Sequence, residues 1–256
     1  MLTILTLYFV KNKETFILRN YESVVFQKGV NQDIYVVSAE SLNLKNNIVV
    51  PVMKNWPIPV KIGFSFNMAI RMINLNNYTH IFKVDGDVML PDDYLINLLA
   101  KKAPVSGIGA ALLISIPFFK KFLKSKYPIS YCDDGYISAL SISLGAWPPK
   151  YDGNGNVLIP PVKYYMNREF MYGSEYYKWG MPLWFITILP FISLIIKHKL
   201  KRFEYRSFKA NLFNLTGYIS AFFKHEKKYY WWKNYSRYRT LHFANRFLSL
   251  RNYLAS

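Results

Sequence analysis

The stretch that decides the fold is His80-Ile-Phe-Lys-Val-Asp85-Gly86-Asp87-Val-Met-Leu-Pro91-Asp92-Asp93. Its apolar start predicts a strand, and Asp85 and Asp87 follow where an α/β sheet opens its ligand crevice. Two carboxylates one residue apart can share a hard divalent cation, which would in turn neutralise a diphosphate. The simpler alternative is that both aspartates cap a turn, and a short D-x-D motif does not by itself decide between the two.

Short apolar runs alternate with helical patterns on both sides of this stretch. That alternation is typical of an α/β fold, in which crossover helices cover a sheet. Apolar residues at helical spacing predict a helix over 61–76 that packs on the sheet. Residues 146–161 are rich in turn-forming residues and predict a hairpin or a mobile loop. The expected strands lie at 3–9, 33–38, 48–52, 80–84 and 105–113.

The chain has 256 residues, of which 52% are hydrophobic and 18% aromatic. This is enough for one large domain, or a domain with an appendage, and it excludes wholesale disorder and small disulfide scaffolds. Cys132 is the only cysteine, so no intramolecular disulfide can form, which fits a reducing compartment. The apolar start of the chain lacks a leading basic segment, and we interpret it as the first strand, not as a signal peptide.

The charge of the chain is strongly basic, with 33 Lys and Arg residues against 15 Asp and Glu residues and a net charge of +18. It predicts attraction to a polyanion: nucleic acid, an anionic membrane or phosphorylated small molecules. Residues 197–256 contain 14 of the basic residues and two of the acidic ones. The longest uncharged stretch, 179–196, ends at the same point. We therefore predict a catalytic domain over residues 1–180 and a membrane-associating helical tail over residues 181–256.

The other paired aspartates differ in context. Asp92 and Asp93 precede a helical pattern, so we expect them in its first turn, where acidic side chains interact favourably with the helix dipole. Asp133 and Asp134 also precede a helical pattern, and one of them is expected to cap the helix. The other is then free to act as a general base that takes a proton from an attacking hydroxyl.

In this order and spacing the motifs resemble the inverting glycosyltransferases of family 2, which have the GT-A fold. The likeness rests on Lys61-x-Gly63-x-x-x-Asn67, Asp85-Gly86-Asp87 and Asp133-Asp134, and covers roughly residues 1–180. The stretch Tyr172-Gly173-x-x-Tyr176-Tyr177-x-x-Gly180 and the apolar segment after it are similar to the membrane-associated prokaryotic branch. The resemblance implies an α/β, Rossmann-like nucleotide-diphospho-sugar transferase fold with C-terminal apolar and amphipathic helices.

The resemblance also implies a reaction and its residues. The reaction is direct transfer of a sugar from a nucleotide-diphosphate donor to a hydroxyl or phosphate acceptor, without a covalent enzyme intermediate. Asp134 matches the catalytic base, and Asp85 and Asp87 match the D-x-D that holds Mg²⁺ or Mn²⁺. Contacts with the nucleotide-sugar donor are expected from Asp85, Glu40, Lys61, Asn67, Asp133 and Arg168.

Three features depart from the family pattern. Glu40 follows the second strand where the family places an acidic pair, and we expect it to substitute in recognition of the base. Asp133 replaces the longer first acid of the family's E-D pair. The sequence has no histidine between His80 and His198, so the extra histidine metal ligand of many members has no counterpart there. Contact with the diphosphate is then expected from Arg168 or Lys163, and the alternative is that both are solvated surface charges.

The uncharged stretch 179–196 would extend about 27 Å as an ideal helix, just short of a hydrocarbon core of about 30 Å, and it contains Pro190. After it, basic positions oppose an apolar side made of Leu200, Phe203, Phe208, Leu212, Leu215, Ile219 and Phe222. Such a helix lies in the membrane interface and is attracted to anionic headgroups. We predict a re-entrant or interfacial anchor at the cytoplasmic face of the cell membrane, near a lipid-linked or glycan acceptor. A single membrane crossing, or a buried helix with a soluble cap, is the alternative.

Two other functions remain as alternatives. The segment 224–239 interleaves aromatic and basic residues, a mixture that can stack bases and hold phosphates, as in a basic nucleic-acid-binding protein. That function leaves the acidic clusters without a role, so nucleic acid is not the expected partner. A catalytically inactive member of the fold that binds a glycan is the second alternative.

Overall fold

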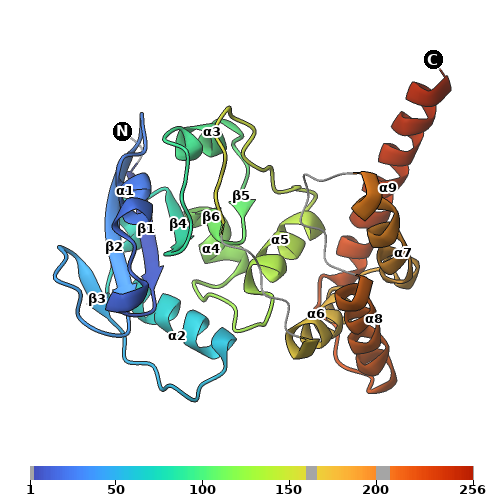
Figure 1. Ribbon diagram of the computed structural model, residues 1–256, viewed down its shortest axis with the longest axis horizontal. Coiled ribbons are helices and arrows are strands. Elements are labelled where there is room, and N and C mark those ends of the chain that lie inside the picture. Colours follow the sequence, from blue (N-terminus) through green and yellow to red (C-terminus); the bar gives the residue numbers. More distant parts are fainter. Residues whose placement is uncertain (1–2, 160–165, 200–207, 256) are drawn as a thin grey trace. The chain divides into compact units, whose positions relative to one another are not determined.

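The computed structural model describes residues 3–159, 166–199 and 208–255. They form two compact units. The first comprises residues 3–141 and 146–159, and the second comprises residues 142–145, 166–199 and 208–255. In Figure 1 the colours of the first unit run from blue to olive, and the long helices of the second are orange to red.

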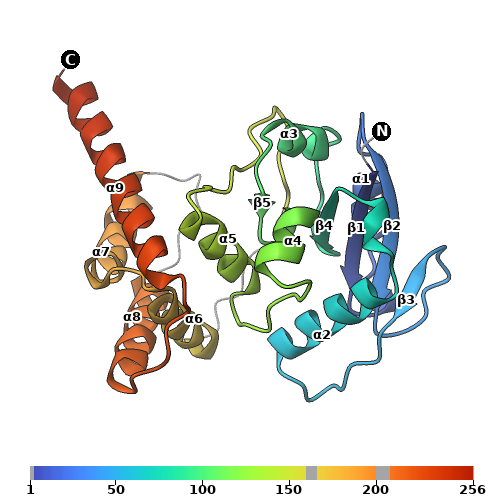
Figure 2. The ribbon, with the colours of Figure 1, turned by 180° about the vertical axis from the view of Figure 1, so that it is seen from behind.

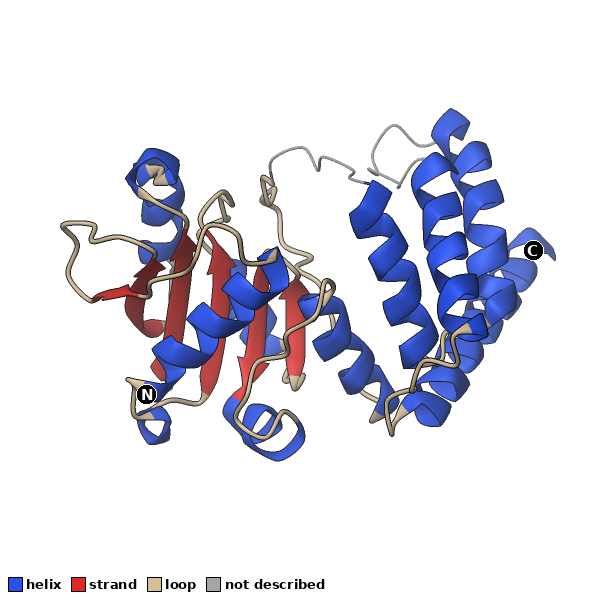
Figure 3. Ribbon diagram, turned by 90° about the horizontal axis from the view of Figure 1, so that it is seen from below, coloured by secondary structure: helices blue, strands red, loops and turns tan. Residues whose placement is uncertain are grey.

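Six strands in the described residues form one mixed sheet in the order β3-β2-β1-β4-β6-β5 (Figure 3). They are β1 (Thr3–Val10), β2 (Asn31–Ser38), β3 (Asn47–Val49), β4 (His80–Asp85), β5 (Val105–Ile108) and β6 (Ala111–Ser115). The first four are parallel, whereas β6 is antiparallel to both β4 and β5. The single strand predicted over 105–113 is therefore a hairpin, because Gly109 and Ala110 form a tight turn between paired Ile108 and Ala111.

Helices cover both faces of the sheet. Alternate side chains of β1 point to opposite faces. Ile4 and Tyr8 belong to a core shared with α1 (Leu18–Val25) and α3 (Tyr94–Ala100). Phe9 stacks on Phe66 of α2 (Ile58–Arg71), and Phe66 contacts Phe119 of α4 (Ile116–Phe122). Accordingly, α1 lies in front of the sheet in Figure 1, whereas α2 and α4 lie in front of it in the reverse view of Figure 2.

The helix predicted over 61–76 is shifted towards the N-terminus in the structure. It begins at Ile58 and includes Pro59 in its first turn. A proline is tolerated there because the N–H groups of the first turn have no intrahelical partner, so none is lost. It ends at Arg71, and Asn74 then accepts a hydrogen bond from the backbone of Asn76 to begin a separate short turn. Asn side chains that bond to the nearby backbone favour such turns over helix.

The loop after β4 lies against the end of β1. The backbone N–H of Gly86 donates to the carbonyl of Phe9 at 2.8 Å. A Cβ atom on Gly86 would lie 2.8 Å from that same oxygen, so the glycine is required by close approach of the two strand ends. Because β1 has β2 on one side and β4 on the other, this is the switch point at which an open α/β sheet binds ligands.

The second unit is built from α6 (Met166–Trp179), α7 (Leu183–Lys199), α8 (Phe208–Phe223) and α9 (Trp232–Ala255). The helices α6 and α8 cross in direct backbone contact. A Cβ atom on Gly173 would lie 1.8 Å from the carbonyl oxygen of Asn214, and one on Gly217 would lie 1.9 Å from that of Phe170. This crossing places α6 in the second unit, whereas the domain predicted over residues 1–180 includes it.

The uncharged stretch forms most of α7, which continues through Pro190. Within the described ranges, no helix has both the length and the apolar character needed to cross a bilayer. The predicted amphipathic pattern over 200–222 falls largely on α8, while Leu200 and Phe203 lie outside the described residues.

Candidate active site

A buried lysine lies beneath the predicted catalytic carboxylates. The Lys83 Nζ atom is 2.7 Å from Oδ1 of Asp85 and donates a second hydrogen bond to the carbonyl of Gly109 at 3.2 Å. Only 4% of the Lys83 side chain is exposed. Burial lowers the pKa of Lys83, but the carboxylates of Asp85, Asp133 and Asp134 raise it to about 12. Lys83 is therefore a fixed positive charge under the site.

Asp134 lies in the first turn of α5 (Asp133–Ser143), against the turn of the β5–β6 hairpin. Its carboxylate occupies the space that a side chain at Gly109 would fill, since a Cβ atom there would be 1.8 Å from Oδ2 of Asp134. Burial raises the pKa of Asp134, Asp133 raises it further, and Lys83 opposes both. A carboxylate with a raised pKa is a stronger proton acceptor, which suits the predicted role of general base.

Asp133 is held in place by a tyrosine. The Tyr127 hydroxyl donates to Oδ2 of Asp133 at 2.6 Å. Tyr127 is fully buried, and burial together with the nearby carboxylates raises the pKa of its phenol well above 10. The phenol therefore stays protonated and donates to Asp133 throughout the physiological pH range. One carboxylate oxygen of Asp133, the residue next to Asp134, is thus already bound by the Tyr127 hydroxyl.

Asp85 begins the tight turn after β4 and Asp87 lies within it; the N–H of Val88 closes this turn by donating to the carbonyl of Asp85 at 3.2 Å. Asp87 is exposed, and 40% of the Asp85 side chain is exposed. Burial of its inner part raises the pKa of Asp85, Lys83 lowers it, and Asp133 and Asp87 raise it again.

These carboxylates fit a divalent cation in number and chemistry. In the part of the chain that the structure describes, no group of three or more His, Cys, Asp or Glu side chains is arranged to hold a metal. A Mg²⁺ site built from one or two carboxylates and substrate phosphates requires no such group. Asp85, Asp133 and Asp134 share the ammonium of Lys83, and Asp87 adds its negative charge beside Asp85. The site therefore has an excess of negative charge, and Asp85 and Asp87 at its exposed end would hold the metal.

Two of the predicted donor contacts lie in the first unit, Glu40 in a loop and Lys61 on a helix. Glu40 follows β2, and its Oε1 atom accepts a hydrogen bond at 2.5 Å from the backbone of Lys13, which follows β1. This places Glu40 at the carboxyl end of the sheet, where the base of a nucleotide is expected. Lys61, at the end of the first turn of α2, donates to the carbonyl of Lys54 at 2.8 Å and so fixes the loop before that helix.

The predicted diphosphate contact Arg168 lies on α6, in the second unit. Its guanidinium is 5.6 Å from the centre of the Tyr172 ring, and its Nε atom is 4.0 Å from the buried carboxylate of Glu169. Both contacts are with residues of its own helix. Lys163 lies outside the described residues.

Asn67 supports the loop that leads to α5. Its amide nitrogen donates to the carbonyl of Tyr127 at 3.1 Å, and its amide oxygen accepts from the N–H of Tyr127 at 2.7 Å. The Tyr127 ring stacks on Phe66, one residue earlier on α2, with ring centres 4.1 Å apart. The structure therefore gives Asn67 a positioning role towards Asp133, through the backbone and ring of Tyr127.

We predict that Asn67→Ala lowers the free energy of unfolding by about 1–3 kcal/mol, because it leaves two backbone groups of Tyr127 without their partner. Thermal melting measures the loss. Asn76→Ala, which removes only the exposed contact with Lys120, is the matched control and should melt within a degree or two of the wild type. Equal melting of the two variants would show that the Asn67 clamp does not stabilise the loop.

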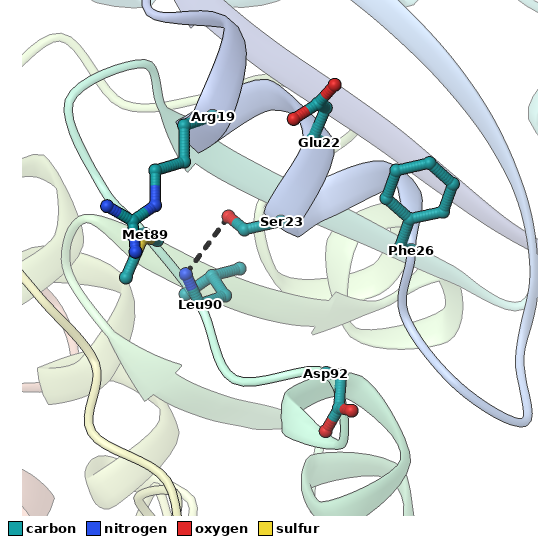
Figure 4. Close-up of a pocket in the computed structure, with 7 residues that line it drawn as sticks. All are labelled: Arg19, Glu22, Ser23, Phe26, Met89, Leu90 and Asp92. Atoms are coloured by element: carbon teal, nitrogen blue, oxygen red, sulfur yellow. Dashed lines mark hydrogen bonds between the residues drawn. The ribbon is translucent and has the colours of Figure 1, made fainter.

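The remaining aspartate pair has a structural role, but both residues precede α3 and do not lie in its first turn as predicted. Asp93 accepts from the Tyr151 hydroxyl at 2.6 Å, and Asp92 pairs with Lys28 at 2.5 Å, both beside the start of α3. A separate open hollow of about 250 Å³ lies nearby between α1 and the segment after β4, lined by Arg19, Glu22, Ser23, Phe26, Met89, Leu90 and Asp92 (Figure 4). None of the predicted site residues lines it, and we assign it no role in the reaction.

No protein-family model matches the sequence, and no curated protein matches it. Among solved structures, the fold is similar to mannosyltransferase PcManGT from Pyrobaculum calidifontis in complex with GDP-Man and Mn²⁺. That match has a TM-score of 0.52 and 10% identity and covers 96% of this chain and 80% of the other. A segment of S. aureus TarS, 1–349 in complex with UDP-GlcNAc, matches with a TM-score of 0.48 and 12% identity over 87% and 73% of the two chains. The first likeness confirms the fold prediction: the chain has the α/β fold of the GT-A glycosyltransferases.

Proposed function

We propose that the protein is a metal-dependent, inverting glycosyltransferase of the family 2 type, which transfers a sugar from a nucleoside-diphosphate donor to a hydroxyl or phosphate acceptor. The observation that carries the proposal is the carboxylate cluster around Lys83, at the switch point of a GT-A sheet. The similar PcManGT was solved with GDP-Man and Mn²⁺, a donor and a metal of this kind.

In the proposed reaction the acceptor oxygen forms a bond to the anomeric carbon while the bond from that carbon to the diphosphate breaks. Asp134 takes the proton of the acceptor hydroxyl. The nucleoside diphosphate leaves with the electron pair of the broken bond. A divalent cation bound to Asp85 and Asp87 would supply positive charge to this leaving group. Lys83 keeps the cluster compact, and Tyr127 orients Asp133 beside the base.

The proposal includes the acceptor and its location. We place the enzyme at the cytoplasmic face of the cell membrane, as a peripheral or monotopic protein, with a lipid-linked or membrane-associated glycan as acceptor. Support comes from the basic residues concentrated in 197–256, which favour an anionic membrane surface.

The nucleic-acid alternative loses part of its support in the structure. Trp231 and Tyr235 are buried in the second unit, and the Tyr229 hydroxyl donates to Glu175. The buried rings of Trp231 and Tyr235 cannot form a platform for bases.

Asp87→Asn tests the metal part of the proposal. We expect at least about tenfold weaker binding of a nucleoside diphosphate in the presence of Mn²⁺ or Mg²⁺, since one of only two metal carboxylates is lost. Calorimetric titration with GDP and UDP, with metal and with chelator, measures the effect. The matched control is Asp92→Asn, an exposed aspartate outside the cluster. If wild-type binding is equal with metal and with chelator, Asp87 does not act through a metal.

A further inference from the structure

The helix α8 presents its apolar residues to solvent and its small and polar residues to the protein. The buried positions are Ala210, Asn211, Asn214, Gly217, Tyr218 and Ala221. Large apolar side chains line the opposite side, at spacings of four, three, four and three residues: Phe208, Leu212, Leu215, Ile219 and Phe222, hereafter the α8 stripe. Leu215 is half-buried, and the other four are 39–53% exposed. A helix on the surface of a soluble domain normally has the reverse arrangement.

The packing of α8 fixes this orientation. Gly217 and Gly173 allow the backbones of α8 and α6 to touch, and no larger side chain fits at either position. Asn214 donates to the fully buried carboxylate of Glu169 at 3.2 Å. Turning the stripe inwards would place Leu and Phe side chains where only glycine fits, and would leave Glu169 without this donor. The stripe therefore faces outwards as a consequence of the helix crossing.

The neighbouring helix adds to the exposed apolar surface. α7 packs on α8 and leaves Leu183, Trp184, Ile188 and Phe191 exposed. Exposed apolar side chains of this number on two adjacent helices are uncommon on a soluble monomer and indicate an interaction surface. Tryptophan among them is typical of the boundary between headgroups and acyl chains.

Charge decides what this surface binds. Lys209 and Lys224 are exposed at the two ends of the stripe. Residues 197–256 contain 14 basic and two acidic residues, so two copies of this unit would repel each other. An anionic lipid surface instead offers negative headgroups for the lysines and acyl chains for the stripe.

We propose that the α8 stripe inserts into the headgroup–acyl boundary of an anionic phospholipid membrane, with α8 parallel to the membrane plane. The proposal rests on the membrane attachment in the proposed function but not on the transfer chemistry. Vesicle binding and nucleotide-sugar turnover therefore test the two separately.

The test is flotation of the full-length protein with phosphatidylcholine vesicles that contain, or lack, one third phosphatidylglycerol. We expect the wild type to float with the anionic vesicles and Leu212→Gln/Ile219→Gln to partition at least about tenfold more weakly, because two apolar side chains no longer insert. Lys209→Gln/Lys224→Gln should weaken binding to anionic vesicles about tenfold and leave binding to neutral vesicles unchanged.

The matched control is Met72→Gln/Ile96→Gln, which changes two exposed apolar residues of the first unit. It should float like the wild type, and all variants should melt like the wild type because the changed side chains are exposed. A wild type that does not bind anionic vesicles would overturn the proposal, as would equal flotation of the stripe variant. A dimeric wild type that becomes monomeric in the stripe variant would assign the stripe to a second copy of the chain instead.

Discussion

Asp134→Asn is expected to lower the rate of sugar transfer by about 10²–10⁴-fold, the usual contribution of a positioned general base. The amide has nearly the shape of the carboxylate but cannot take the proton of the acceptor hydroxyl. Asp134 contacts the hairpin at Gly109, whereas the expected metal ligands Asp85 and Asp87 follow β4. Donor binding in the presence of metal should therefore remain close to that of the wild type.

The two readouts are turnover of a nucleotide-sugar and calorimetric binding of the nucleoside diphosphate. Asp92→Asn makes the same chemical change at an exposed aspartate paired with Lys28, and should leave both unchanged. Near wild-type turnover of Asp134→Asn would remove this residue from the mechanism. The inactive glycan-binding alternative would be favoured if the wild type binds the nucleoside diphosphate but turns over none of the donors with any membrane acceptor tried.

A third readout separates loss of chemistry from loss of fold. The folded state raises the pKa of Asp134, so the folded protein holds this proton more tightly than the unfolded chain does. Above the unfolded pKa the charged carboxylate therefore costs stability. Asp134→Asn should melt higher than the wild type at neutral pH, by about 2–4 °C for each kcal/mol relieved. The gain should disappear as the pH falls below the ordinary pKa of an aspartate. A lower melting temperature at neutral pH would contradict this account.

Local sequence patterns are sufficient to predict the parallel strands and the helix that packs on them. Apolar runs of strand length predict the parallel strands, and the change to helical spacing predicts α2. The hairpin of β5 and β6 was missed because its turn, Gly109-Ala110, lies inside one uncharged run. Which helix packs with which depends on contacts distant in sequence. Gly173 and Gly217 are unremarkable separately, and only their contact places α6 in the second unit.

The candidate site divides in the same way. Asp85, Asp87, Asp133 and Asp134 could be predicted because acidic residues are scarce in this chain and cluster at element ends. Lys83 was not predicted, although a lysine inside an apolar strand next to a D-x-D motif is a signal in itself. Tyr127 gives no such signal, because one tyrosine among 21 shows nothing of its partner until the loop folds onto α2. The residues proposed to hold the metal and to take the proton follow local sequence patterns, while the residues that orient them are found only in the packing.

Lys83→Met should lower the free energy of unfolding of the first unit by about 3 kcal/mol. This is the low end of the usual cost of breaking a buried ion pair, because Asp85 is partly exposed. The methionine fills most of the volume of the lysine, but Asp85, Asp133 and Asp134 lose the ammonium that opposes their mutual repulsion. Urea unfolding at pH 8 measures the loss. Lys101→Met, which removes the exposed pair with Asp152, should cost less than about 1 kcal/mol.

The pH dependence shows whether charge, and not packing, is the cause. Lys83 lowers the pKa values of Asp85 and Asp134, so its removal raises both further above their unfolded values. A carboxyl group whose pKa is higher in the folded than in the unfolded state lowers the stability of the fold as the pH rises from the unfolded pKa to the folded pKa. The deficit of Lys83→Met should therefore be smaller at pH 5 than at pH 8. It should also be smaller in the Asp134→Asn background, in which one fewer carboxylate is left unopposed. A deficit that is the same at both pH values and in both backgrounds would mean that Lys83 only fills space.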